Sequence, residues 1–155
     1  MFLYKLYYSI AKNTDIICSM FRKKKNQNRG QVIIPENHPN PPLPHEVNIA
    51  SVLAGHYHTV VQFIIPVDDY KRKSADIVMH GVQWELKCPT GSSKSTIGNQ
   101  LRWASKQSKY IVLDTRHTKL AYEDIEKRVQ REVNRTSSIK KVVLITKSEK
   151  IVVIE

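Results

Sequence analysis

Residues 75–88 constrain the fold of this chain more than any other segment, because apolar and polar side chains alternate along their second half. The apolar positions are Val82, Trp84, Leu86 and Cys88, and the polar positions between them are Gln83, Glu85 and Lys87. A period of two is typical of a β-strand. The central His80-Gly81 pair suits a two-residue turn. The segment therefore predicts an antiparallel β-hairpin.

A turn at residues 80–81 sets the register of this hairpin and places Asp76 directly opposite Glu85. Their Cβ atoms are then expected about 4.5–5.5 Å apart, and like charges at that separation destabilise a sheet. A divalent cation such as Mg²⁺ between the two carboxylates would remove the repulsion. Lys87 shares their face and would lie beside bound water or developing charge. The alternative is a solvated charge pair, the common meaning of an isolated Glu-x-Lys.

Length and composition favour one globular domain with a substantial core, since 41% of the 155 residues are hydrophobic and 25% are charged. The net charge of +11 indicates a polyanionic partner. The two cysteines, Cys18 and Cys88, form no disulfide framework, and Cys88 is expected to be a small buried side chain. His56-x-His58 lacks a third zinc ligand in sequence, and His117 is expected at the surface.

The first 44 residues differ in composition from the rest of the chain. An apolar run over residues 1–21 precedes the basic run 22–25, which is the reverse of a signal peptide. Lys5, Lys12 and Asp15 disfavour a membrane span, so an amphipathic helix is expected there. Residues 22–44 become rich in proline and predict a linker or extended arm. We therefore divide the chain into residues 1–44 and a domain over residues 45–155.

The domain alternates predicted helices with predicted strands. Helices are expected over residues 45–55, 95–108 and 121–133, and strands over 60–66, 75–79, 82–88, 110–114, 141–146 and 151–154. This order predicts an α/β sandwich with a mixed central β-sheet flanked by helices. Glu46 falls on the apolar stripe of the first helix, with Ile49, Ala50 and Leu53. A carboxylate directed inward needs a partner.

Basic residues recur at helical spacing in two places and are candidates for phosphate contacts. They are Arg102, Lys106 and Lys109 on one helix, and Lys127, Arg128, Arg131 and Arg135 on the next. The alternative for either set is an ordinary solvated helix face. Trp103 could stack on a base of single-stranded RNA, although core packing is the commoner fate of a tryptophan.

The order of the charged residues resembles the PD-(D/E)xK phosphodiesterase superfamily. Glu46, Asp76 and the Glu85-x-Lys87 pair follow its pattern, Gln100 lies on the next helix, and Ala75 replaces the proline of the motif. The resemblance implies a restriction-endonuclease-like sandwich. It also implies catalytic roles for Glu46, Asp76, Glu85, Lys87 and Gln100. The three carboxylates would bind a divalent metal, Mg²⁺ first, with Mn²⁺ or Zn²⁺ as alternatives.

A closer resemblance involves residues 85–91, 99–101 and 110–114. These segments look like the carboxy-terminal tRNA-nuclease toxin domain of CdiA-type contact-dependent growth inhibition proteins. The resemblance implies cleavage of tRNA in the cytoplasm after delivery as a toxin, and a cognate immunity protein. Two alternatives remain open: a DNA endonuclease of the restriction or resolvase type, and a non-catalytic nucleic-acid-binding domain. The oligomeric state is not indicated by the sequence.

Overall fold

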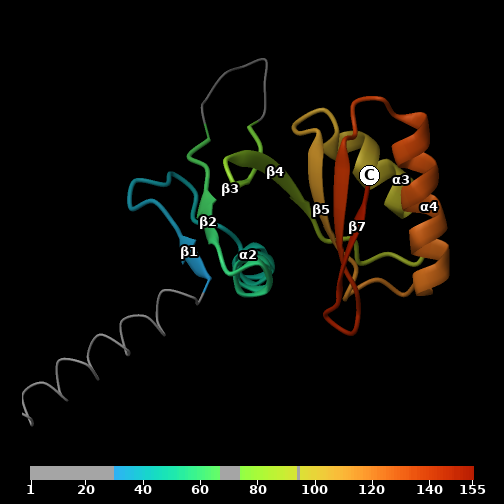
Figure 1. Cartoon of the computed structure of the whole chain (residues 1–155), viewed down its shortest axis with the longest axis horizontal. Helices are drawn as coiled ribbons and strands as arrows, with labels where there is room; N and C mark the ends of the chain where they lie inside the picture. The colour runs from blue at the N-terminus through green and yellow to red at the C-terminus, as the bar shows by residue number, and fades with distance from the viewer. Residues whose placement is uncertain (1–29, 67–73, 94) are drawn as a thin grey trace, which may run out of the picture.

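A computed structural model describes residues 30–66, 74–93 and 95–155 (Figure 1). Its elements in chain order are β1 (Gln31–Ile33), α2 (Pro44–Tyr57), β2 (Val60–Phe63), β3 (Ile77–Met79), β4 (Val82–Lys87), α3 (Thr96–Ala104), β5 (Tyr110–Asp114), α4 (Tyr122–Arg135), β6 (Lys141–Ile145) and β7 (Ile151–Ile154). None of these helices is long and apolar enough to span a bilayer.

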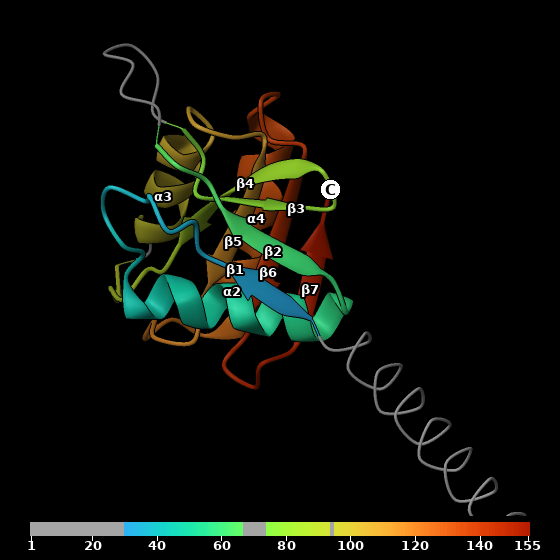
Figure 2. The same cartoon turned by 90° about the vertical axis from the view of Figure 1, so that its left-hand side faces the viewer.

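The seven strands form one sheet in which spatial order equals chain order. Strand β1 is parallel to β2, and β4, β5 and β6 are mutually parallel, while the other neighbours are antiparallel. Helix α2 lies on one side of the sheet, and α3 and α4 lie on the other (Figures 1 and 2). This confirms the predicted α/β sandwich with a mixed central sheet flanked by helices.

The sheet separates two hydrophobic cores. On one side, Ile49 and Leu53 of α2 are fully buried against strand residues that include Ile77. On the other side, residues of α3 and α4 such as Leu101 and Val129 are fully buried. Residues 111–113 of β5 have no exposed surface, because each strand face is covered. The uninterrupted apolar run at residues 111–113 predicted a strand that is covered on both faces.

The hairpin forms with the predicted turn and register. His80 and Gly81 both have positive φ, 53° and 73°, as a primed two-residue turn requires. Ile77 pairs with Trp84, and Met79 pairs with Val82. This register, continued by one residue, places Asp76 opposite Glu85.

Strand β1 differs from the predicted linker, because residues 31–33 pair with the exposed edge of β2. Gly30 makes this possible: a Cβ there would lie 1.7 Å from the Ala54 carbonyl oxygen, so only glycine fits against α2. Composition alone could not show that an unpaired strand edge was available. The predicted division near residue 44 stays a prediction. The predicted helix over residues 1–21 and the loop 68–73 lie outside the described residues.

Candidate active site

Asp76 and Glu85 meet at the open end of the hairpin. Asp76 precedes β3, and its backbone N–H donates to the Trp84 carbonyl oxygen at 3.1 Å. Its Oδ2 accepts a hydrogen bond from the Leu86 N–H at 2.7 Å. These bonds hold Asp76 across the hairpin from Glu85, as the register predicts.

The Glu85 carboxylate is buried, with only 1% of the residue exposed. Its Oε1 accepts from Lys87 Nζ and, at 2.7 Å, from Gln107 Nε2. Its Oε2 has no hydrogen-bond partner among the described residues. Burial, followed by the charge of Asp76, raises the pKa of Glu85 to about 7. A solvated charge pair, the alternative interpretation of this motif, is therefore wrong.

Asp76 is also held in an environment that opposes its ionisation. Desolvation raises its pKa, and the negative charge of Glu46 raises it further, while the Leu86 hydrogen bond and Lys87 lower it. A proton or a cation at the pair would supply positive charge that relieves this opposition to ionisation. Lys87 supplies part of that charge through its ion pair with Glu85.

Glu46 lies in the first turn of α2 and is half-buried, close enough to Asp76 for its charge to raise the pKa of that residue. Its Oε2 accepts the Leu43 N–H at 2.8 Å, which satisfies an otherwise unpaired donor at the amino end of the helix. The structure thus gives Glu46 a capping bond, and within the described residues the oxygens of Glu46, Asp76 and Glu85 do not all lie within 4.8 Å of one another.

Gln107 rather than Gln100 contacts the Glu85 carboxylate. Gln100 is half-buried on α3, and its side chain makes no hydrogen bond within the described residues. Helix α3 ends at Ala104, but the Gln107 N–H still donates to the Ala104 carbonyl oxygen at 2.9 Å. The chain therefore continues to turn, and Gln107 lies two turns past Gln100 on about the same side. This spacing was visible in the sequence, yet Gln107 was missed.

The predicted basic residues separate into tethered and exposed groups. Arg102 donates to Asn99 Oδ1, and its Nη1 lies 3.6 Å from Glu132 Oε1 of α4, so its charge is partly used within the fold. Lys106 and Lys109 are exposed beyond the end of α3. Trp103 has 57% of its surface exposed, so the expected core packing of this tryptophan is wrong.

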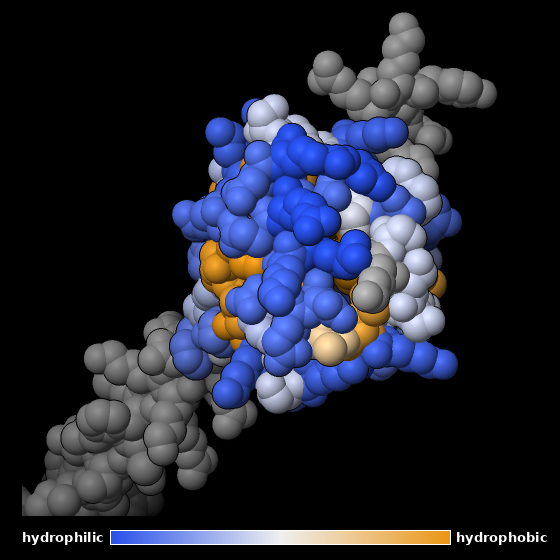
Figure 3. Space-filling model, turned by 90° about the vertical axis from the view of Figure 1, so that its right-hand side faces the viewer, coloured by the Kyte–Doolittle hydropathy of each residue, from blue (hydrophilic) through white to orange (hydrophobic). Residues whose placement is uncertain are grey.

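Helix α4 presents a second basic surface. Lys127, Arg131 and Arg135 are exposed and line a shallow depression with Gln130 and Asn134, whereas Arg128 is half-buried. Figure 3 shows that hydrophilic side chains cover most of this side of the molecule.

The residues at the carboxylate pair fit a hard divalent cation. Asp76, Glu85 and the nearby Glu46 offer only oxygen donors, which Mg²⁺ and similar ions prefer. The buried Glu85 Oε2 lacks a partner in the described part of the chain, and the pKa values of both paired carboxyls are raised. A bound cation would give Oε2 a partner and would stabilise the ionised form of both carboxyls.

Comparisons with known proteins place this chain in a family. The family described as the contact-dependent growth inhibition CdiA C-terminal domain matches residues 73–151, a range that contains Asp76, Glu85 and Lys87. A solved CdiA-CT/CdiI toxin and immunity complex from Burkholderia pseudomallei includes a chain of similar fold. The TM-score is 0.58 at 19% identity, over 81% of this chain and 99% of that chain.

A comparison with curated protein sequences gives no match. The matched range contains the whole β3–β4 hairpin and extends through β6 to the first residue of β7. This chain belongs to the CdiA C-terminal domain family of contact-dependent growth inhibition proteins.

Proposed function

We propose that this chain is a metal-dependent phosphodiesterase of the PD-(D/E)xK type, a toxin ribonuclease that cleaves tRNA. The observation that carries the proposal is the buried Glu85 opposite the half-buried Asp76, with Lys87 paired to Glu85. Two carboxylates in such a place destabilise the protein on their own. Such a pair beside a lysine is expected in a site that binds both a metal cation and a phosphate group.

Each residue has a role that follows from its contacts. Asp76 and Glu85 hold the cation, with Glu46 from the α2 side, and a bound divalent ion supplies charge neutralisation and an activated water. Lys87 stabilises negative charge that develops on the phosphate. Gln107 and Lys87 both donate hydrogen bonds to Glu85 Oε1, so Oε2 is available to bind the cation.

Substrate contacts come from side chains next to this site. Lys106 and Lys109 flank Gln107 and are exposed, so they can bind phosphates near the carboxylates. Trp103 offers an exposed ring on which an unpaired base can stack. Arg102, Arg128 and Arg131 extend the positive surface toward α4. Gln100 faces the same side of α3 as Gln107 and can contact the substrate.

A cognate immunity protein is the expected partner in the producing cell. The Burkholderia pseudomallei structure of similar fold is a toxin and immunity complex. Delivery into a target cell, followed by RNA cleavage in its cytoplasm, fits membership of this family.

A substrate panel tests the proposal. Purified protein would be incubated with total tRNA, single-stranded DNA and duplex DNA, each with Mg²⁺, Mn²⁺, Zn²⁺ or EDTA. We expect cleavage of tRNA with a divalent ion, abolished by EDTA and reduced at least about a hundredfold in Asp76→Asn and Lys87→Ala. Lys119→Ala, at an exposed lysine between β5 and α4, is the matched control.

Other outcomes would contradict the proposal in different ways. Cleavage restricted to duplex DNA would make the protein a DNA endonuclease. Binding of nucleic acid with no cleavage under any condition would make it a non-catalytic binding domain. In cells, growth arrest on induction of the wild type should be relieved by Glu85→Gln.

A further inference from the structure

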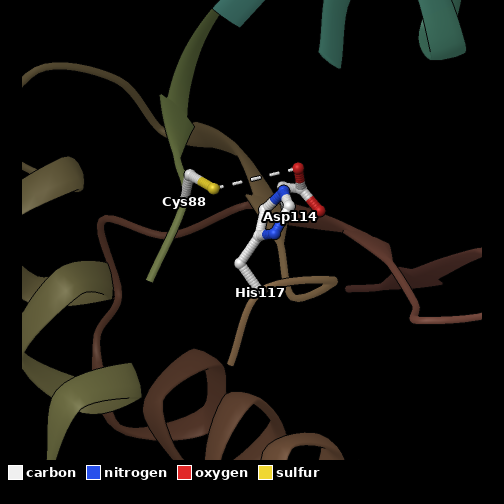
Figure 4. Close-up of side chains that lie close together, drawn as sticks. All are labelled: Cys88, Asp114 and His117. Atoms are coloured by element: carbon white, nitrogen blue, oxygen red, sulfur yellow. Dashed lines mark hydrogen bonds between the residues drawn. The ribbon is translucent and has the colours of Figure 1, made fainter. Parts of the chain in front are cut away.

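Three metal-ligating side chains converge at the carboxyl ends of β4 and β5. Glu85 pairs with Ile111 and Lys87 with Leu113 in the parallel register, so the next residue, Cys88, lies beside Asp114. His117 follows in the turn after β5. One ligand atom from each of Cys88, Asp114 and His117 lies within 4.8 Å of the others (Figure 4).

This cluster is separate from the carboxylate pair of the proposed active site. Side chains alternate along a strand, so Cys88 faces away from Glu85 and Lys87. Cys88 packs against the core on the α2 side, whereas Glu85 binds Gln107 on the α3 side. Three residues of strand separate Cys88 from Glu85, roughly 10 Å. A ligand at Cys88 would therefore not occupy the active site.

Asp114 retains one lone pair that no nitrogen donor of the described residues uses. Its Oδ1 accepts from the backbone N–H and Nε of Arg116, at 3.1 and 2.9 Å. Its Oδ2 accepts from Arg116 Nη2 at 2.8 Å, and the other contact of Oδ2 is the Cys88 thiol, with Sγ at 3.9 Å. A carboxylate has about four lone-pair sites. The fourth is thus directed at Cys88, where a cation could replace the thiol proton.

The charges around the cluster also favour a divalent cation. Arg116 is paired with Asp114 and, at 3.3 Å, with Glu149. With a Cys88 thiolate, three negative charges would stand against the single positive charge of Arg116. Arg116 Nη2 also donates to Asn48 of α2 at 2.6 Å, so the guanidinium is held in place on the far side of Asp114.

We propose that Cys88, Asp114 and His117 form a zinc site at the ends of β4 and β5, distinct from the active site. Thiolate, imidazole and carboxylate are ligands that zinc takes, and Mg²⁺ does not take sulfur. Binding transfers the Cys88 thiol proton to solvent, and the sulfur then binds the metal. Asp114 is buried and His117 is exposed, so the site opens to solvent and water supplies the fourth ligand.

Cobalt substitution provides a direct test, because Co²⁺ bound by a thiolate gives a charge-transfer band in the near ultraviolet. Metal-free full-length protein would be titrated with Co²⁺ and then with Zn²⁺. We expect one tightly bound equivalent with the thiolate band, displaced by Zn²⁺ but not by Mg²⁺. Cys88→Ser should abolish the band, and His117→Ala should weaken binding about tenfold or more.

Matched variants locate the metal. Cys18→Ser removes the second cysteine of the chain and should leave the band intact, and His56→Ala should leave the affinity unchanged. A double variant, Asp76→Asn with Glu85→Gln, should keep the band although it loses the carboxylate site. Loss of the band in Cys18→Ser, or unchanged binding by His117→Ala, would overturn the proposal. None of these readouts depends on nuclease activity.

Discussion

The two oxygens of the Glu85 carboxylate differ in their surroundings. Oε1 is saturated by Lys87 and Gln107, and Oε2 is buried without a partner in the described part of the chain. Two donors on one oxygen restrict the carboxylate to one orientation, because a rotated group would lose both bonds. Gln107 is therefore a positioning residue.

Replacement of Gln107 by leucine should lower nuclease activity without unfolding the protein. A hydrogen bond to a charged group contributes about 1.5–3 kcal/mol. We therefore expect a roughly tenfold to hundredfold loss of the rate constant, measured as single-turnover cleavage at several Mg²⁺ concentrations. Gln83→Leu, the same exchange at an exposed position of β4, is the control. Equal rates for the two variants would show that Gln107 does not orient Glu85.

Trp103 should affect RNA affinity far more than stability. With 57% of its surface exposed, its replacement by alanine is expected to change the unfolding free energy by about 0.5 kcal/mol or less. Loss of one stacked base costs about 1–3 kcal/mol, so affinity for single-stranded RNA should fall about tenfold, and Trp103→Phe should restore most of it. A destabilisation of about 3–5 kcal/mol would instead indicate that the ring is packed in a core.

At the level of elements, the β3–β4 hairpin decides whether the site exists. Its turn sets the register, and a slip by one residue would move Glu85 to the opposite face of the sheet. Gly81 carries φ of 73°, where a Cβ is unfavourable. The turn therefore determines on which face of the sheet Glu85, four residues further along the chain, lies.

Two glycine-to-alanine substitutions should change stability in opposite directions. Gly81→Ala should destabilise the protein by about 1 kcal/mol, because alanine adopts a positive φ at a cost. Gly55→Ala lies inside α2 with no atom within 4 Å of the new Cβ, and it should stabilise by about 0.5–1 kcal/mol. Urea unfolding measures both. A stabilising Gly81→Ala would contradict the assigned turn.

For the whole molecule, the buried Glu85 carboxylate links folding to pH. The pKa of Glu85 rises from 4.5 to about 7 on folding, so the folded state binds a proton more tightly than the unfolded state. The resulting stability is fully present below pH 4.5 and is lost as the pH rises through about 7.

In the presence of EDTA, the free energy of unfolding should therefore fall by a few kcal/mol between about pH 4.5 and pH 8. Glu85→Gln should flatten this dependence and be more stable than the wild type at pH 8, since its amide is never charged. Added Mg²⁺ at pH 8 should stabilise the wild type but not the variant. Chemical unfolding across this pH range measures each effect. Identical pH profiles for the two proteins would show that Glu85 does not cause the dependence.

Much of the fold could be predicted because its local signals agree. Alternation predicted the hairpin, the His80-Gly81 turn predicted its register, and uninterrupted apolar residues predicted the doubly covered β5. Strand β1 was missed because a segment of three residues becomes a strand only where a neighbouring edge accepts it. Gln107 was not predicted as a site residue because Gln100 was expected to be the helix residue that faces the carboxylates.

By itself, the sequence determined the kinds of chemistry present: which positions carry carboxylates, which share a strand face, and how positive the chain is. The tertiary structure alone decided which of these groups are buried and what they touch. It buried Glu85, left one of its oxygens without a partner in the described residues, exposed Trp103, and brought Cys88 to Asp114 and His117. The physical reason is that solvation and non-local contacts depend on all elements at once, whereas alternation and turn conformation depend on a few neighbouring residues.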